Sequence, residues 1–176
     1  MGDSVADPVN TVTLETVIEQ QRLHDVLVRG WCIGVDTLNW KLYRSVLAGE
    51  VEMDFPDAST AGASTPKKWQ ADAWVKLARQ VEGFDATQHC VTNFIYDING
   101  DSAVVRSYII ADHHLGGEFF TLGGQSIHTF ERTAQGWRIV KVGLHPWWMK
   151  GNPALMGKAA ERYLAKQAPR SAKAIG

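Results

Sequence analysis

The feature that most constrains the fold is a block of alternating apolar and polar residues between positions 88 and 145. Four such runs follow one another with only short turns between them: 88–98, 103–114, 119–132 and 137–145. The first turn contains Asn99 and Gly100, and Asn-Gly between two alternating runs is a strong signal of a β-hairpin. Alternation with a period of two indicates strands with one buried face. The sequence therefore predicts an antiparallel meander of four strands.

The residues before this block have mostly helical periodicity. Residues 12–35 predict a long amphipathic helix, and residues 39–47 predict a second helix that begins at Asn39 and stops at Gly49. The other expected elements are a strand at 51–55, a loop at 56–66 that could gate a site, a helix at 67–81 and a short helix at 152–167. Helices followed by a meander predict the α+β class, with a curved antiparallel sheet and the helices on one face.

The composition describes one soluble globular domain. The chain has 176 residues, of which 45% are hydrophobic and 21% are charged. We expect a flexible N-terminus at 1–11, the domain at 12–150 and a C-terminal helical tail at 151–176. The formal net charge of -1 provides no basic field for nucleic acid or for an anionic membrane surface. A small neutral molecule is the expected partner.

The location of the protein is predicted from missing signals. The acidic N-terminal sequence has no basic segment followed by an apolar one, and no apolar run reaches the length of a membrane span. The expected compartment is therefore the cytoplasm, with no membrane association. Cys32 in a helix and Cys90 in a strand are interpreted as reduced packing residues.

The parity of the strands indicates which side chains face the interior. In residues 103–113 the odd positions are small and apolar and end in His113, so this set should face a cavity between the sheet and the helices. In residues 121–131 the two sets are mixed, and the inward face is not decided. His128 could be structural or functional, whereas His24 and His145 are interpreted as structural or solvated.

Four segments carry a resemblance to a known family. VDTLNW, TQHCVTNF, IIADHH and FERTAQGWRIVKVGLHP occur in that order, and residues 12–150 resemble the SnoaL-like branch of the nuclear transport factor 2 superfamily. This resemblance implies a cone-shaped, cystatin-like α+β fold with a curved antiparallel sheet wrapped around N-terminal helices. Within the SnoaL-like branch, the enzymes that the chain resembles are scytalone dehydratase and hexachlorocyclohexane dehydrochlorinase, and more distantly bile-acid dehydratase.

The resemblance also implies a catalytic pair. Those enzymes use an Asp at the end of the first helix and a His at the start of the strand after the third helix, and the matching positions are Asp36 and His89. A carboxylate that accepts the Nδ1 hydrogen would fix the imidazole tautomer and increase its basicity as a general base. Without the resemblance, Asp36 could equally cap the following helix. His113 matches a second histidine, which would assist the leaving group or a developing oxyanion.

Other predicted site residues are contacts for the substrate. His114 is the alternate to His113 if a bulge shifts the strand, and Ser126 lies where scytalone dehydratase has an amide. Val35 and Phe55 replace tyrosines of that enzyme, so its particular mechanism does not transfer. The expected substrate-binding set is Trp40, Phe55, His114, Ser126, Trp147 and Trp148, with the HPWW stretch as a lid after the last strand.

These predictions point to a cofactor-independent lyase of the dehydratase type, or an isomerase, acting on a small hydrophobic cyclic molecule such as a polyketide, steroid, terpenoid or halogenated ring. Two alternatives remain open. Asp36, His89 and His113 could bind a metal, although no HExxH or His-x-His spacing occurs, and we predict neither metal nor nucleotide cofactor. The fold also serves as a non-catalytic oligomerisation subunit, such as the small subunit of ring-hydroxylating dioxygenases. A homodimer or homotrimer is expected.

Overall fold

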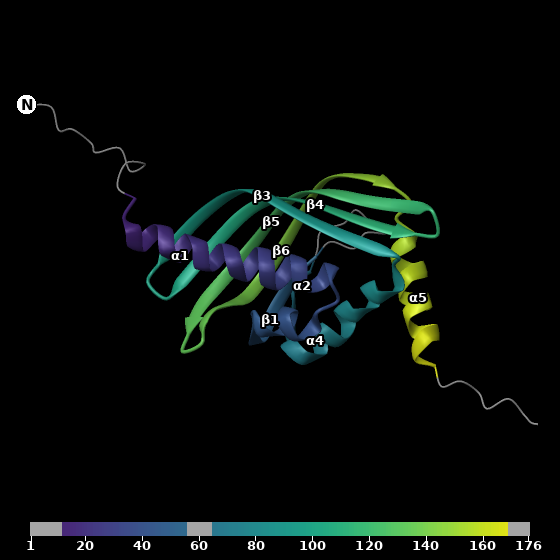
Figure 1. The fold of residues 1–176 in the computed structure, drawn as a ribbon, viewed down its shortest axis with the longest axis horizontal. Helices are drawn as coiled ribbons and strands as arrows, with labels where there is room; N and C mark the ends of the chain where they lie inside the picture. Colours follow the sequence, from purple (N-terminus) through teal and green to yellow (C-terminus); the bar gives the residue numbers. More distant parts are fainter. Residues whose placement is uncertain (1–11, 56–64, 169–176) are drawn as a thin grey trace, which may run out of the picture.

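The computed structural model describes residues 12–55 and 65–168, and these contain one six-stranded sheet with helices at one face. The strand order is β2-β1-β6-β5-β4-β3. The strands are β1 (Leu47–Asp54), β2 (Lys67–Gln70), β3 (Ala86–Asn99), β4 (Ser102–Leu115), β5 (Glu118–Thr133) and β6 (Gly136–Gly151). Strands β3 to β6 pair antiparallel in sequence order, which confirms the predicted meander. The long strands arch over the helices in Figure 1.

The helical elements are α1 (Leu14–Asp25), η2 (Val26–Cys32), α2 (Ile33–Asp36), α3 (Trp40–Ser45), α4 (Ala71–Ala78), η3 (Arg79–Gly83) and α5 (Leu155–Gln167). The predicted helix at 12–35 corresponds to α1, η2 and α2 in succession, with Thr13 accepting a hydrogen bond from the Thr16 amide at its start. Its middle part, η2, is a π-helix, a rare form that is frequent at functional sites. No helix in the described ranges is long and apolar enough to cross a membrane.

Three predicted boundaries are corrected. The helix expected at 39–47 ends at Ser45, and Gly49 lies inside β1 rather than stopping a helix. The helix expected at 67–81 begins only at Ala71, because the preceding residues form β2 and pair with β1. The last strand continues past residue 145 to Gly151. Pro146 is accommodated there at a register shift between β5 and β6, where a missing amide hydrogen is tolerated.

The core lies between the helices and the concave face of the sheet. Leu23 and Leu27 from the first helix pack with Phe130 and Ile139 from β5 and β6, all at 0% exposure. A smaller cluster at the end of the sheet near α5 contains Phe84, Phe120, Leu122, Leu155 and Ala159. Cys32 is buried as predicted. Cys90 is exposed, which corrects its interpretation as a packing residue, because position 90 of β3 lies on the face opposite to His89.

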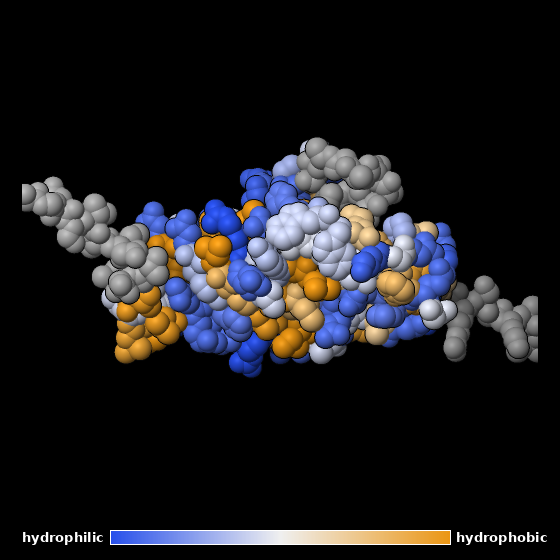
Figure 2. All heavy atoms as spheres, turned by 90° about the horizontal axis from the view of Figure 1, so that it is seen from above, coloured by the Kyte–Doolittle hydropathy of each residue, from blue (hydrophilic) through white to orange (hydrophobic). Residues whose placement is uncertain are grey.

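The face of the sheet that points away from the helices is partly apolar. Tyr108, Ile110 and Trp147 are each more than 40% exposed, and the ring of Trp147 meets Tyr108 edge-on with centroids 5.0 Å apart. Figure 2, which views the molecule from above, shows hydrophobic side chains among hydrophilic ones across the face on that side.

Some predictions fall wholly or partly outside the described residues. The flexible N-terminus at 1–11, residues 56–64 of the expected loop and residues 169–176 of the tail are in this group. The described part of the tail forms α5, which packs against η3 at the end of the sheet. The division into a domain and a helical tail stays a prediction.

Candidate active site

Asp36 lies at the last position of α2 and is held by three donors from β3. Its Oδ1 accepts hydrogen bonds from the Thr87 hydroxyl at 2.8 Å and from His89 Nδ1 at 2.6 Å. Its Oδ2 accepts the His89 backbone amide at 2.7 Å. The structure therefore brings together the two residues that the resemblance implies. Asp36 connects the end of the first helix to the start of β3, and it does not cap α3, because Asn39 performs that role.

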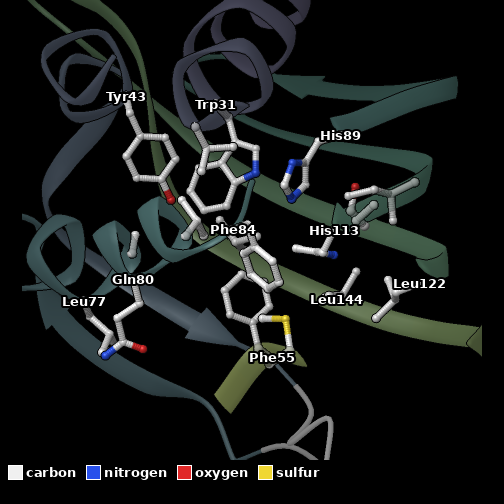
Figure 3. A pocket seen from close by; sticks show the side chains of 18 of the residues that line it. Trp31, Tyr43, Phe55, Leu77, Gln80, Phe84, His89, His113, Leu122 and Leu144 are labelled. Atoms are coloured by element: carbon white, nitrogen blue, oxygen red, sulfur yellow. The ribbon is translucent and has the colours of Figure 1, made fainter. Parts of the chain in front are cut away.

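The hydrogen bond between Asp36 and His89 determines the tautomer of the imidazole. A carboxylate can only accept, so the Nδ1 of His89 carries the hydrogen. In the neutral ring, Nε2 is then the unprotonated nitrogen, and the ring lines the cavity. Figure 3 shows the His89 ring directed into the cavity, between Trp31 and His113. The pair is sheltered, with 15% of the His89 side chain and 19% of the Asp36 side chain exposed.

The surroundings of Asp36 keep it ionised. Burial disfavours the charged carboxylate, but the hydrogen bonds and charge of His89, together with the Thr87 hydroxyl, outweigh burial and hold the pKa of Asp36 below its ordinary value. A charged Asp36 can stabilise an imidazolium formed on His89 after proton transfer.

The cavity in front of His89 is apolar and has a volume of about 330 Å³. Its size falls in the range of small-molecule sites. Side chains from the helices, the sheet and α5 line it, including Trp31, Phe84, Leu122, Leu144 and Met156. No Asp, Glu, Lys or Arg occurs among the described residues that line it. The cavity therefore suits a neutral, largely apolar molecule.

His113 lies beside His89 in the cavity wall, with ring centroids 5.6 Å apart. Its Nδ1 is 3.3 Å from the carbonyl oxygen of Phe120, so Nδ1 donates and Nε2 is left as an acceptor. Burial, reinforced by the neighbouring His89, lowers the pKa of His113 to about 4. His113 is thus a neutral imidazole at neutral pH. This tautomer has no Nε2 hydrogen to offer an oxyanion.

Two of the predicted substrate contacts line the cavity, and four do not. Phe55 and Ser126 line it, and the Ser126 hydroxyl is also hydrogen-bonded to Ser107 at 2.9 Å. The residues placed outside it are Trp40, His114, Trp147 and Trp148.

Each of these four corrections has a physical reason. Trp40 packs edge-on against Tyr43 outside the cavity wall. His114 is exposed because β4 keeps regular alternation through His113, so its neighbour faces the other way. Trp147 and Trp148 line a separate pocket with Tyr108 instead of forming a lid, because β6 continues through them.

Several cavity residues were not predicted. Trp31 and Tyr43 are helix residues whose spacing indicated only core packing, and their rings lie 4.8 Å apart at the cavity wall. The Tyr43 hydroxyl accepts a hydrogen bond from Trp74 Nε1 at 2.9 Å. His128 lines the cavity at 1% exposure. The mixed parity of β5 left its direction open, and the pairing of His128 with Val105 of β4 decides it.

The three residues weighed as metal ligands are Asp36, His89 and His113. Protein donors occupy both carboxylate oxygens of Asp36. Within the described ranges, no group of three or more His, Cys, Asp or Glu side chains is arranged to hold a metal ion.

The fold and the site together define a class of protein: a cone-shaped α+β domain with a carboxylate–imidazole pair at an apolar interior cavity. Residues 23–143 match the SnoaL-like domain, and the chain belongs to this family. No curated protein matches the chain.

Solved structures share the fold. A protein from Novosphingobium aromaticivorans assigned as a scytalone dehydratase has 18% identity and a TM-score of 0.66, over 77% of this chain and 89% of that one. An NTF2-like protein with a cystatin-like fold from the same organism has 16% identity and a TM-score of 0.62, over 81% and 92%. The hexachlorocyclohexane dehydrochlorinase LinA-type3 of Novosphingobium barchaimii has 14% identity and a TM-score of 0.64, over 79% and 93%. The predicted fold and family are confirmed.

Proposed function

We propose that the protein is a cofactor-independent lyase of the dehydratase type, or an isomerase, in which His89 removes a proton from an activated carbon of a small hydrophobic cyclic substrate. The observation that supports this most strongly is the 2.6 Å contact between His89 Nδ1 and Asp36 Oδ1, in a ring that lines an apolar cavity. Two structural neighbours are named as a dehydratase and a dehydrochlorinase, which agrees with elimination chemistry.

The proposed step needs no external reagent. In an elimination, Nε2 of His89 takes the proton, the electrons of the C–H bond form the new double bond, and the leaving group departs with its own bonding pair; for loss of water, the proton on His89 then passes to the departing oxygen. In an isomerisation no group departs: the electrons of the C–H bond form a new double bond, the existing double bond shifts its electron pair to a different carbon, and that carbon takes the proton back from His89. Asp36 orients the ring and stabilises the imidazolium, and proton transfer by a placed base is typically worth about 10²–10⁴ in rate.

His113 has a narrower role in this proposal than the resemblance implied. Its Nε2 lone pair can accept a hydrogen bond from a hydroxyl group or from a departing water molecule. Because its Nδ1 hydrogen points at the Phe120 carbonyl, we propose that His113 positions the leaving group and does not stabilise an oxyanion.

The experiment uses a simple ketone whose α-protons are acidic. 2-Tetralone is dissolved in D₂O with the protein, and the loss of its α-proton signals is followed by NMR. We expect the wild type to accelerate exchange over buffer, and we expect His89→Gln and Asp36→Asn to slow the catalysed exchange by about 10²–10⁴-fold. Circular dichroism of each variant checks that the fold is kept.

Asp112 offers a matched control. Its carboxylate also accepts a hydrogen bond from a threonine, Thr121, but it does not line the cavity. Asp112→Asn should exchange 2-tetralone at the wild-type rate. Catalysed exchange that survives unchanged in either His89→Gln or Asp36→Asn would contradict the proposal. A wild type that does not accelerate exchange over buffer would favour a non-catalytic binding subunit.

A further inference from the structure

His128 is a buried histidine whose polarity the packing does not explain. Its side chain is 1% exposed and lines the same cavity as His89, yet neither ring nitrogen has a hydrogen-bond partner among the described residues. Buried polar atoms are nearly always paired, and each unpaired one costs folding free energy. A phenylalanine would fill similar space without this cost. An imidazole at this position therefore points to a partner that the protein alone does not supply.

The surroundings of His128 are aromatic and uncharged. The Trp31 ring meets it edge-on at 5.5 Å, Phe130 lies 6.2 Å away, and its strand neighbours are Val105 and Val142. Burial lowers the pKa of His128 to about 3, so the ring is neutral at neutral pH. A neutral imidazole carries one N–H donor and one acceptor nitrogen. It can pair with a hydroxyl or a carbonyl oxygen of a ligand.

The strand register places His128 away from the catalytic pair. His89 pairs with Ala111 of β4, whereas His128 pairs with Val105, six positions further along that strand. The two histidines therefore lie at different places along the cavity that both line. A ligand whose reacting carbon lies at His89 and that also reaches His128 extends along the cavity between them.

We infer that His128 binds an oxygen atom of the ligand at the end remote from the reacting carbon. This rests on the proposed function, which locates the reacting carbon at His89. The substrate class is then a neutral molecule that carries a hydroxyl or carbonyl group at that remote end. Both nitrogens are closed to solvent in the structure, so binding requires the ring to turn about its Cβ–Cγ bond.

The test compares two ligands that differ in one hydroxyl group, 2-tetralone and 6-hydroxy-2-tetralone. By calorimetry, the wild type should bind the hydroxylated ketone about five- to tenfold more tightly, the gain expected of one hydrogen bond. In His128→Phe this preference should fall to about one. His24→Phe is the matched control, because His24 also has an unpaired buried nitrogen and an aromatic edge contact, to Phe94, but does not line the cavity.

A second measurement uses the wild type itself. The side-chain ¹⁵N signals of His128 should shift on addition of 6-hydroxy-2-tetralone and remain in place with 2-tetralone. The melting temperature of His128→Phe should equal or exceed that of the wild type, whereas a purely structural role would lower it.

The inference is overturned if His128→Phe keeps the preference for the hydroxylated ketone, or if the wild type binds both ketones equally. Neither result affects the proposed function. The exchange of α-protons in 2-tetralone depends on His89 and needs no hydroxyl group, so the two ideas fail separately.

Discussion

At the scale of single residues, Asp36 is the side chain on which the site depends, and Thr87 contributes to its position. The Thr87 hydroxyl donates to the same oxygen that receives His89 Nδ1. Thr87→Val keeps the shape of the side chain and removes this donor. Because His89 still holds Asp36 through two hydrogen bonds, we expect the catalysed exchange of 2-tetralone to fall by only about tenfold, the value of one lost hydrogen bond.

The control for this change is Thr121→Val, which removes the equivalent hydrogen bond to Asp112 on the outer face of the sheet. It should leave the exchange rate unchanged. A loss as large as that of Asp36→Asn in the Thr87 variant would mean that β3 itself had moved, and amide chemical shifts of β3 would reveal such a movement.

The residues of the site differ in how far the sequence could predict them. Asp36 and His89 could be predicted because short segments that resemble the family fix their positions at the ends of a helix and a strand. The regular alternation of β4 correctly predicted that His113 faces inward. Trp40, Trp147 and Trp148 were wrongly placed because aromatic residues at the end of an element fit a cavity wall and a packed surface equally well. His128 could not be assigned, because residues 122–126 of β5 carry glycine and serine on the inward face and weaken the pattern.

At the scale of elements, the meander and the first helix were predictable because their periodicity is long and regular. The missed boundaries are places where tertiary pairing overrides local preference. β2 exists because residues 67–70 pair with β1, and no signal within those four residues indicates this. β6 passes through Pro146 because a register shift removes the need for its amide hydrogen.

The contact between η3 and α5 supports a prediction at this scale. A Cβ atom added to Gly83 would lie 1.8 Å from the carbonyl oxygen of Ala159, so the two backbones meet directly. Gly83→Ala must push α5 away, which displaces Met156 from the cavity. We expect a loss of about 1–3 kcal/mol in the free energy of unfolding, as for other overpacked contacts, and faster amide hydrogen exchange throughout α5.

Gly157 is the matched control, because it lies in α5 and a Cβ there would meet nothing within 4 Å. Gly157→Ala should raise helix stability by up to about 1 kcal/mol. If the amide hydrogens of α5 exchange as slowly in the Gly83→Ala variant as in the wild type, the packing of α5 against η3 does not depend on this contact.

At the scale of the whole molecule, the exposed side chains of Tyr108, Ile110 and Trp147 on the outer sheet face agree with the expected homodimer or homotrimer. The oligomeric state remains a prediction, and light scattering at several protein concentrations measures it. A monomer at all concentrations would contradict it.

The stability of the whole molecule should depend on pH through two buried histidines. Burial, with the nearby His89, lowers the pKa of His113 to about 4, and burial lowers that of His128 to about 3, from ordinary values of 6.5. Below pH 6.5 these two histidines therefore bind protons in the unfolded chain and not in the folded chain. Their contribution to the free energy of unfolding is fully present above pH 6.5 and decreases as the pH falls towards 4.

Each of these histidines contributes a slope of up to about 1.4 kcal/mol per pH unit in this range. Asp36 affects stability at lower pH than the histidines. Its pKa is lowered in the folded chain, so the stability that the ionised carboxylate contributes is lost only as the pH falls below the ordinary carboxylate range, through the pKa of the folded state. His128→Phe should therefore remove about half of the slope due to the two histidines, and its stability advantage over the wild type should grow as the pH falls from 6.5 to 4. Urea unfolding at four pH values across this range measures it. If the free energies of unfolding of the wild type and His128→Phe change in parallel with pH, His128 binds a proton as readily in the folded chain as in the unfolded one.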